Sequence, residues 1–345
     1  MSDLVNTPAT AGAPPPNPVA RALRFAFMRF GILPFLLVIV VVVFGLVESR
    51  FLSGANLSNV ARQATFLMIV AMAQCRVLIT GGLDLSLGAL VGLVTVTTAS
   101  VMTALIAGGS DPAVAILLAI GAGVLAALAV GLFNGLCVSL LGLNPFITTL
   151  ASMTALNGIS LTLSNGVPIG NLPQDFVQVM SINRYFGMQA PIIATILLAI
   201  LGMFFLYYTR MGRYFFAVGS NGRAARLSGI PAQQIRLAAY VGAALFTSVA
   251  GILMLARTGT GAAAIGAEFG LQSIAACVIA GVSLHGGAGR IGNVVLGALF
   301  LALLSNGMNI AQIQSYLQMI VLGAILVLAL VGDRVRMRLL GQREH

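Results

Sequence analysis

Residues 113 to 141 read AVAILLAIGAGVLAALAVGLFNGLCVSLL, and no charged side chain interrupts them. A helix of this length, at about 1.5 Å per residue, is longer than the roughly 30 Å of a bilayer's hydrocarbon core. The whole chain is 59% hydrophobic and 8% charged, whereas a soluble domain carries about 25% charged residues. We therefore expect an all-α polytopic membrane protein.

Similar apolar runs recur along nearly the whole sequence and predict about ten transmembrane segments, although nine or eleven remain possible. The eighth run is short for a complete span, and the fourth is long enough to be tilted or broken. The approximate bounds of the ten runs are 30 to 47, 60 to 79, 85 to 107, 113 to 141, 145 to 164, 190 to 209, 236 to 256, 271 to 285, 291 to 309 and 315 to 332.

The basic residues indicate the orientation of these spans, because cytoplasmic loops retain arginine and translocated loops are depleted of it. With both termini in the cytoplasm, the outer segments hold only Arg50, Arg62, Arg184 and Arg257. The cytoplasmic segments then hold Arg21, Arg24, Arg29, Arg210, Arg213, Arg223, Arg226, Arg236, Arg290, Arg334, Arg336, Arg338 and Arg343. The net charge of +10 is thus explained by topology, and no nucleic-acid partner is expected.

The same pattern divides the chain into three parts. Residues 1–20 are rich in Pro, Ala and Thr and are expected to form a disordered cytoplasmic tail. Residues 21–335 form the transmembrane domain, with a basic cytoplasmic loop at 210–236 and an external loop at 165–189. Residues 336–345 are expected to be a basic cytoplasmic tail.

Several chemistries are excluded by composition. All 18 basic residues are arginine, so the chain lacks the lysine that a Walker-type phosphate loop or Schiff-base catalysis requires. The two histidines are His285 and His345, too few for a His-rich metal site. We expect no catalytic residue, no metal site and no cofactor, and ATP hydrolysis would need a separate subunit.

The segment ITGGLDLSLGALVGL, residues 79 to 93, combines a flexible glycine pair with a polar turn before an apolar run. Gly81 and Gly82 permit a tight bend, and Asp84 or Ser86 can cap the helix that follows. A direct role of Asp84 in solute passage is the alternative. The segment resembles the GGIDLSVG signature of the permeases of ribose-type ABC transporters.

Further stretches resemble the same family in the same order, from about residue 60 to the end of the chain. They are GLFNGLCVSLLGLNPFITTLASM at 131–153, NGVPI at 165–169, GRYFFAVGSNGRAARLSGI at 212–230 and IAACVIAGVSLHGGAGRIGNVVLGAL at 274–299, followed by SNG at 305–307. Family membership implies a carbohydrate-import permease in the bacterial inner (plasma) membrane that works by alternating access. It also implies as partners a cytoplasmic ATP-binding subunit, a periplasmic or extracellular solute-binding protein, and a second permease subunit in a homo- or heterodimer.

The loop at 210–236 contains a short predicted helix that Ser220 or Asn221 can cap and Gly229 can end. Such a short helix is marginal alone in water and needs a surface to dock against. The resemblance identifies it as the coupling helix that contacts the ATPase subunit. Its residues are Ser220, Asn221, Arg223, Ala224, Ala225, Arg226, Ser228 and Gly229.

Polar residues within the spans are candidates for a translocation pathway, although each could equally hydrogen-bond between helices. The candidates are Asn134, Thr148, Ser152, Asn157, Gln272, Asn306 and Asn309. Three positions depart from the family pattern, namely Arg76, Asn157 with Gly158, and Glu268. We expect Arg76 to extend to the inner headgroups.

Other functions remain as alternatives. A permease for branched-chain amino acids or nucleosides would share this architecture. An ion-coupled secondary transporter normally has ionisable groups at mid-membrane, whereas the acids here fall at predicted span ends or in loops. An intramembrane enzyme is disfavoured because no nucleophile has a neighbouring base. The sequence does not identify the solute.

Overall fold

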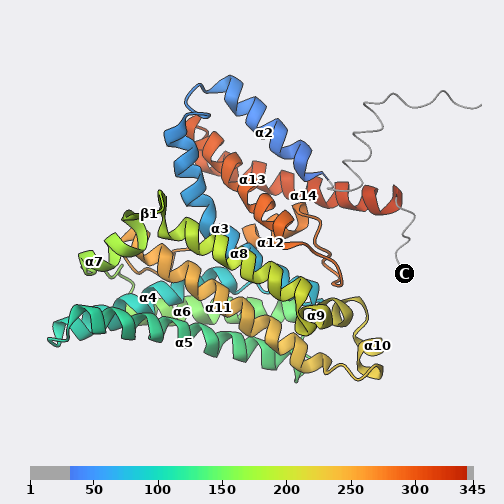
Figure 1. Ribbon diagram of the computed structural model, residues 1–345, viewed down its shortest axis with the longest axis horizontal. Coiled ribbons are helices and arrows are strands. Elements are labelled where there is room, and N and C mark those ends of the chain that lie inside the picture. Colours follow the sequence, from blue (N-terminus) through green and yellow to red (C-terminus); the bar gives the residue numbers. More distant parts are fainter. Residues whose placement is uncertain (1–31, 340–345) are drawn as a thin grey trace, which may run out of the picture.

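The apolar runs of the sequence fold into helices in the computed structural model, which describes residues 32–339 (Figure 1). The expected tail at 1–20 and the arginines at 21, 24 and 29 lie outside the described residues, as do residues 340–345. Each of the ten predicted runs contains one helix. These helices are α2 (Leu33–Val47), α3 (Gly54–Ile79), α4 (Leu87–Ala107), α5 (Pro112–Ser139), α6 (Pro145–Ser164), α8 (Ala190–Tyr208), α11 (Ala232–Thr258), α12 (Phe269–Ile279), α13 (Ile291–Ile310) and α14 (Ser315–Leu339).

Seven of these helices, α3 to α6, α8, α11 and α13, are long and apolar enough to cross a membrane, whereas the apolar parts of α2, α12 and α14 are shorter. The polytopic all-α class is thus confirmed for the described residues. The two long loops carry the short elements α7 (Gln174–Val177), η1 (Gln178–Ile182), β1 (Arg184–Tyr185), β2 (Met188–Gln189), α9 (Arg210–Ser220) and α10 (Gly222–Leu227).

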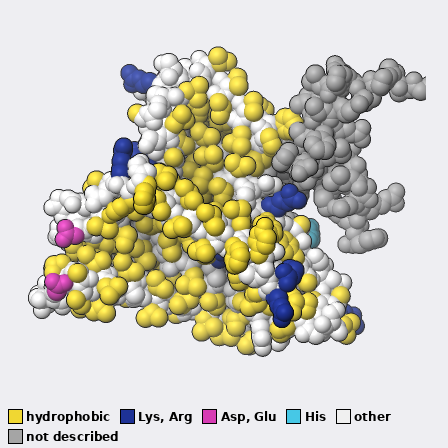
Figure 2. Space-filling model, viewed as in Figure 1, with side chains coloured by type: hydrophobic (Ala, Val, Ile, Leu, Met, Phe, Trp, Pro, Cys, Tyr) yellow, Lys and Arg dark blue, Asp and Glu magenta, His cyan; other side chains and the backbone are white. Residues whose placement is uncertain are grey.

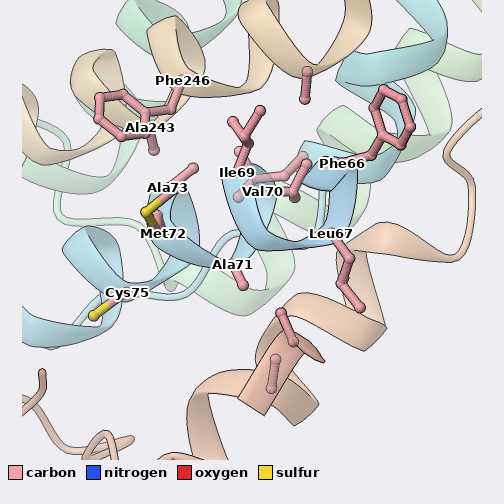
Figure 3. Packing of buried hydrophobic residues seen from close by; sticks show 14 of the residues in the cluster. Phe66, Leu67, Ile69, Val70, Ala71, Met72, Ala73, Cys75, Ala243 and Phe246 are labelled. Atoms are coloured by element: carbon pink, nitrogen blue, oxygen red, sulfur yellow. The ribbon is translucent and has the colours of Figure 1, made fainter. Parts of the chain in front are cut away.

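Helix α3 is the centre of the packing. Its residues from Ala64 to Ile79 are almost all buried, and it contacts α11, α13, α12 and α8. Figure 3 shows its side chains pointing to all sides, with Ala243 and Phe246 of α11 facing it from one side. A helix that is apolar all round belongs in a protein interior, and α3 fits this rule.

The long helices run between two ends of the molecule. Helices α9 and α10 and the end of α14 lie at the right of Figure 1, and α7 and β1 lie at the left. Between these ends, the face shown in Figure 2 is largely hydrophobic, and its acidic side chains lie at the left end. The surface therefore has an apolar middle with polar ends, as a membrane requires.

The eighth predicted run differs most from expectation. Its helix covers only Phe269–Ile279, and residues 259–268 before it are not helical. This segment packs along α4 and the turn before it. A Cβ on Gly261 would lie 2.5 Å from the Thr95 carbonyl oxygen, and one on Gly270 would lie 2.7 Å from that of Leu85. The end of the segment, at Gly266, packs against Gly88 of α4. Gly88 and Thr95 are about 10 Å apart along the helix, so after α11 ends the chain runs back along α4 by that distance.

Two glycines of α4 make room for this re-entrant segment. A Cβ on Gly92 would lie 2.5 Å from the Ala263 carbonyl oxygen, and one on Gly88 would lie 2.7 Å from that of Gly266. Small residues at this spacing commonly bring two helices together. The partner is instead an irregular backbone, which tolerates membrane depth only when it is buried in protein.

Substituting Gly92→Ala should destabilise the protein by about 1–3 kcal/mol, because backbone atoms of the re-entrant segment cannot move aside without strain. Gly121→Ala in α5 is the matched control, since no atom lies within 4 Å of its added Cβ. Thermal unfolding of both variants in detergent would test the packing. Equal melting temperatures for the two variants would contradict it.

Candidate functional site

The polar turn at 80–86 lies inside the protein, where four helices hold it. The Asp84 Oδ1 accepts hydrogen bonds from the Ser86 amide at 2.9 Å and the Ser86 hydroxyl at 2.6 Å. Neither side chain caps the amides of α4 itself. In the amide orientation that satisfies both groups, Gln74 donates to the Asp84 carbonyl at 2.9 Å and accepts from its N–H at 3.3 Å.

The same turn is tied to α5 and α6 by a chain of hydrogen bonds. The Ser152 hydroxyl donates to Asn134 Oδ1 at 2.5 Å, and Asn134 Nδ2 donates to the Ser86 hydroxyl at 2.9 Å. Asn134 is fully buried, and Ser152 and Asp84 nearly so. The chain Ser152, Asn134, Ser86, Asp84 therefore joins α6, α5 and the turn in one satisfied polar cluster.

Two further side chains hold the backbone of the turn. The Thr149 hydroxyl of α6 accepts from the Leu85 amide at 3.1 Å, and the Tyr240 hydroxyl of α11 donates to the Leu83 carbonyl at 3.1 Å. Unpaired peptide groups at this depth would cost free energy. These contacts show how an irregular turn is tolerated in the protein interior.

The other pathway candidates have different environments. Asn306 of α13 exchanges two amide hydrogen bonds, of 2.8 and 3.0 Å, with Asn56 of α3. Asn309 accepts from Gln318 at 2.8 Å, and Gln272 donates to Glu268 at 2.9 Å. Each of these amides thus has a protein partner.

Two cavities contain pathway candidates. Thr148 and Ser152 line an open cavity of about 460 Å³ between α5 and α6. Glu268 and Gln272 line one of about 310 Å³ among α12, α13 and α14. The half-buried Asn157 of α6 lines neither of them. The structure therefore brings Asn134, Ser152, Ser86 and Asp84 together and leaves the other candidates dispersed.

Removing the amide of Asn134 should cost about 1–3 kcal/mol, because Asn134→Ala leaves the buried Ser152 hydroxyl without its acceptor. Asn157→Ala on the same bundle should change stability by no more than about 0.5 kcal/mol, as for a surface substitution. Melting temperatures of the two purified variants would test this difference. A loss in Asn157→Ala as large as that in Asn134→Ala would refute the assignment.

The basic loop forms two consecutive helices, α9 and α10, at one end of the bundle. The Asn221 side chain caps α10 by accepting from the amides of Arg223 at 3.1 Å and Ala224 at 2.9 Å. Ser220 is the last residue of α9 and makes no such cap, and Gly229 follows α10 with φ of 79°. The predicted short helix is present, and Asn221 rather than Ser220 caps it.

Helix α10 presents a basic and apolar surface. Arg223, Arg226 and Ser228 are exposed, and Leu227 is 84% exposed. Ala225 is buried and faces the protein. The exposed set can contact a partner, whereas Ala225 anchors the helix to the bundle.

The preceding helix, α9, touches the C-terminal end of α3 and the α12–α13 loop directly. A Cβ on Gly219 of α9 would overlap the Ile79 carbonyl, the last residue of α3, and would lie 2.5 Å from the Gly287 amide. The Gly287 amide itself donates to the Ile79 carbonyl at 2.9 Å. Three backbones, from α9, α3 and the α12–α13 loop, therefore meet at one point, which we call the glycine junction (Ile79, Gly219, Gly287).

Arg76 does not extend to headgroups as expected. It is buried, with its guanidinium 3.4 Å from the ring centre of Phe246 and one nitrogen donating to the Gly242 carbonyl at 3.3 Å. Cation–π contact replaces water around this charge. The predicted extension of Arg76 to the headgroups is therefore wrong, because Phe246 of α11 offers the guanidinium a buried aromatic contact instead.

Four residues that hold these sites were not predicted from the sequence, namely Gln74, Thr149, Tyr240 and Gly219. Gln74 is an amide within a long apolar run, which is a usable signal for a buried hydrogen-bonding role. Gly219 gives no such signal, because its importance depends on contacts with residues far away in the sequence.

Comparison with known proteins places the chain in a family. The family model described as the permease component of the branched-chain amino acid transport system matches residues 56–330. The ribose import permease protein RbsC of Bacillus subtilis (strain 168) is 33% identical over 303 residues, covering 87% of this chain and 92% of the relative. No solved structure gives a significant match.

Two other relatives have similar coverage. The D-allose transport system permease protein AlsC of Escherichia coli (strain K12) is 33% identical over 87% of this chain and 90% of its own length. The xylose transport system permease protein XylH of Haemophilus influenzae is 31% identical over 83% of this chain and 90% of its own. Because these matches span almost the whole of both chains, this protein belongs to the branched-chain amino acid transport system / permease component family, together with these sugar permeases.

Proposed function

We propose that the chain is the membrane-spanning permease subunit of an ATP-driven ABC importer for a sugar or sugar-like solute in the bacterial inner membrane. The observation that carries this proposal is the 31–33% identity to ribose, allose and xylose permeases over most of both chains. The subunit is not an enzyme, and ATP hydrolysis takes place in a separate cytoplasmic subunit. A solute-binding protein and a second permease subunit complete the importer.

The proposed topology has ten crossings with both termini in the cytoplasm. Its support is the alternation of the long helices between the two ends in Figure 1, with α9 and α10 at the arginine-rich end. The shorter α12 reaches across together with residues 259–268, which pack along α4. Retention of arginine on the inner side favours this orientation over the reverse.

Coupling to the ATPase is proposed for the exposed residues of α10. Arg223 and Arg226 project a positive charge that a carboxylate-lined groove would accept, and Leu227 adds apolar contact area. Asn221 fixes the start of α10, so its orientation is defined before the partner binds. The same loop leads into the glycine junction, which links the docking surface to the spans.

Reversing both charges in Arg223→Glu/Arg226→Glu should lower copurification of the ATPase and solute uptake by about tenfold or more, because like charges across an interface are costly. Membrane insertion should be unchanged. Arg50→Glu/Arg184→Glu, at the opposite end, is the control of equal charge change. Normal copurification and uptake in the first variant would remove the coupling assignment.

Transmission through the glycine junction predicts a different defect. Gly219→Ala should reduce uptake severalfold while the ATPase still copurifies, because its Cβ would force α9 away from Ile79 but leaves α10 exposed. Gly292→Ala, whose added Cβ has no neighbour within 4 Å, is the control. Full uptake in Gly219→Ala would show that force does not pass through this contact.

The translocation pathway stays a prediction, and the structure favours Asn157 and Gln272 within it. Both amides are only half-buried, whereas Asn134, Ser152 and Asn306 are buried in hydrogen bonds within the protein. The Asn157 side chain has no hydrogen-bond partner among the described residues, and Gln272 donates to Glu268 at the wall of an open cavity, so both amides can reach water or a solute. Asn157→Ala/Gln272→Ala should therefore slow uptake of labelled sugar with little change in melting temperature. An unaltered uptake rate would exclude both residues.

The alternatives are weaker on these observations. The family description includes branched-chain amino acid systems, but the relatives above are sugar permeases. An ion-coupled transporter is disfavoured by the similarity to these sugar permeases. The position of the acids no longer excludes one, because Glu268 lies at the end of the re-entrant segment that packs against Gly88 of α4. Glu268 is therefore deeper than expected.

A further inference from the structure

The cavity among α12, α13 and α14 contains an exposed carboxylate. Glu268 immediately precedes α12, and Gln272, one turn further on, donates to its Oε2 at 2.9 Å. Among the side chains that the structure describes, no cation pairs with this carboxylate. The cavity, of about 310 Å³, therefore carries a negative charge that its own walls do not neutralise.

The depth of Glu268 follows from its neighbours. A Cβ on Gly88, at the start of α4, would lie 3.0 Å from the carbonyl oxygen of Ala267, so Glu268 lies beside the start of α4. The turn that leads into α4 accepts a hydrogen bond from Tyr240, and α11 begins at Ala232. This level is about 12 Å from the α10 end of α11 and about 27 Å from its other end. Because α11 exceeds the roughly 30 Å hydrocarbon core by only about 10 Å, Glu268 lies within the core.

A carboxylate at this depth indicates water beside it. An unpaired charge in hydrocarbon is costly, so charged side chains inside a membrane face the bundle interior or a water-filled space. Glu268 is exposed and not enclosed by the bundle. The face of α12 that carries Glu268, Leu271 and Gln272 therefore borders an aqueous passage and not lipid.

The pair of side chains leaves two hydrogen-bond acceptors free. A carboxylate can only accept, so the NH2 group of Gln272 faces Glu268 and the amide oxygen is left over. The hydrogen bond uses Oε2 of Glu268, and Oε1 has no partner among the described residues. Two adjacent acceptors suit a solute with neighbouring hydroxyl donors, and the charged acceptor makes the stronger bond. The same charge repels a carboxylate or phosphate group on a solute.

The rest of the cavity suits a small uncharged molecule. Its volume of about 310 Å³ is at the lower end of the about 300–1,000 Å³ of small-molecule sites. Beside the two polar side chains, its walls are apolar, with Leu271 of α12, Leu301 of α13 and Leu322 of α14. Apolar walls can contact the C–H groups of a sugar ring while its hydroxyls reach Glu268 and Gln272.

We propose that Glu268 and Gln272 form a solute contact in the translocation pathway that selects neutral polyhydroxylated solutes over anionic ones. The proposal rests on the proposed function and adds Glu268 as the residue that selects for hydroxyl groups. Helix α12 continues into the loop that contributes Gly287 to the glycine junction. A movement of the junction therefore acts on the helix that begins at the solute contact.

Cysteine substitution tests whether water reaches this face. The native cysteines Cys75, Cys137 and Cys277 are buried and give a low background. In membrane vesicles, Glu268→Cys in the full-length permease should react with a water-soluble methanethiosulfonate reagent about tenfold or more faster than Leu201→Cys, because the reactive thiolate forms in water. Leu201 is 58% exposed on the apolar face of α8 and serves as the lipid-facing control. Equally slow reaction at both positions would contradict the aqueous passage.

Uptake by the complete importer tests the solute contact itself. Proteoliposomes contain the permease and its ATPase, and the solute-binding protein is saturated with a sugar that the wild type accumulates. Glu268→Gln should lower the maximal uptake rate by about fivefold or more, because it replaces a charged acceptor with a neutral one. ATPase copurification and the melting temperature should not change. Glu48→Gln, the same substitution directly after α2, is the matched control and should leave uptake unchanged.

Monodeoxy analogues of the same sugar, carried by the same binding protein, isolate the hydroxyl contact. The wild type should transport at least one analogue more slowly than the parent sugar. In Glu268→Gln the ratio of the parent rate to the rate of that analogue should fall toward one, because the hydroxyl has lost its charged acceptor. A purely structural role of Glu268 would lower both rates equally.

Several results would overturn the proposal. They are an unchanged uptake rate in Glu268→Gln, an unchanged ratio of parent to analogue, or loss of the second permease subunit from the purified variant, which would assign the carboxylate to the subunit interface. If the wild type accumulates no sugar at all, the proposed function fails and the solute contact fails with it. The labelling of Glu268→Cys does not depend on transport and still shows whether this face borders water.

Discussion

Close backbone contact at the glycine junction is the constraint on which the account depends. Ile79 ends the most buried helix of the bundle, Gly287 lies in the loop before α13, and Gly219 lies in the last turn of α9, the helix that leads to α10. Since no side chain separates these backbones, a displacement of α9 cannot be absorbed by rotamer changes. It must move α3 or the α12–α13 loop, and α3 touches most of the other spans.

The interior polar cluster gives this motion a defined direction. The turn that follows Ile79 is held by Gln74, Thr149, Tyr240 and the chain from Asp84 to Ser152. Hydrogen bonds in a low-dielectric interior are costly to leave unmade. The turn, α5 and α6 therefore tend to move as a unit with the end of α3, and the re-entrant segment beside α4 lies against the same unit.

The length of the apolar runs was sufficient to predict the helices, because that length is set by the thickness of the bilayer. All ten predicted runs contain a helix, and the capped helix in the basic loop is present. The irregular, turn-rich path of 259–268 could not be predicted, since an apolar, Gly- and Ala-rich run is compatible with a helix and with a buried irregular segment. The inward path of Arg76 depended on Phe246, which is far away in the sequence. The site residues divide in the same way. Asn134 and Ser152 were recognisable as polar residues in apolar helices and Ser86 as a candidate helix cap, but the hydrogen bonds that join Ser152 to Asn134 and Asn134 to Ser86 depend on how the helices pack.

The central claim is that this chain is a passage that opens only when a separate ATPase acts on its cytoplasmic loop. The most direct measurement is uptake of radiolabelled ribose, allose and xylose into vesicles containing the permease, with its solute-binding protein present. The account predicts accumulation of at least one of these sugars only when the ATPase and ATP are both supplied. Accumulation in vesicles that lack the ATPase and nucleotide, at the rate of the complete system, would contradict it.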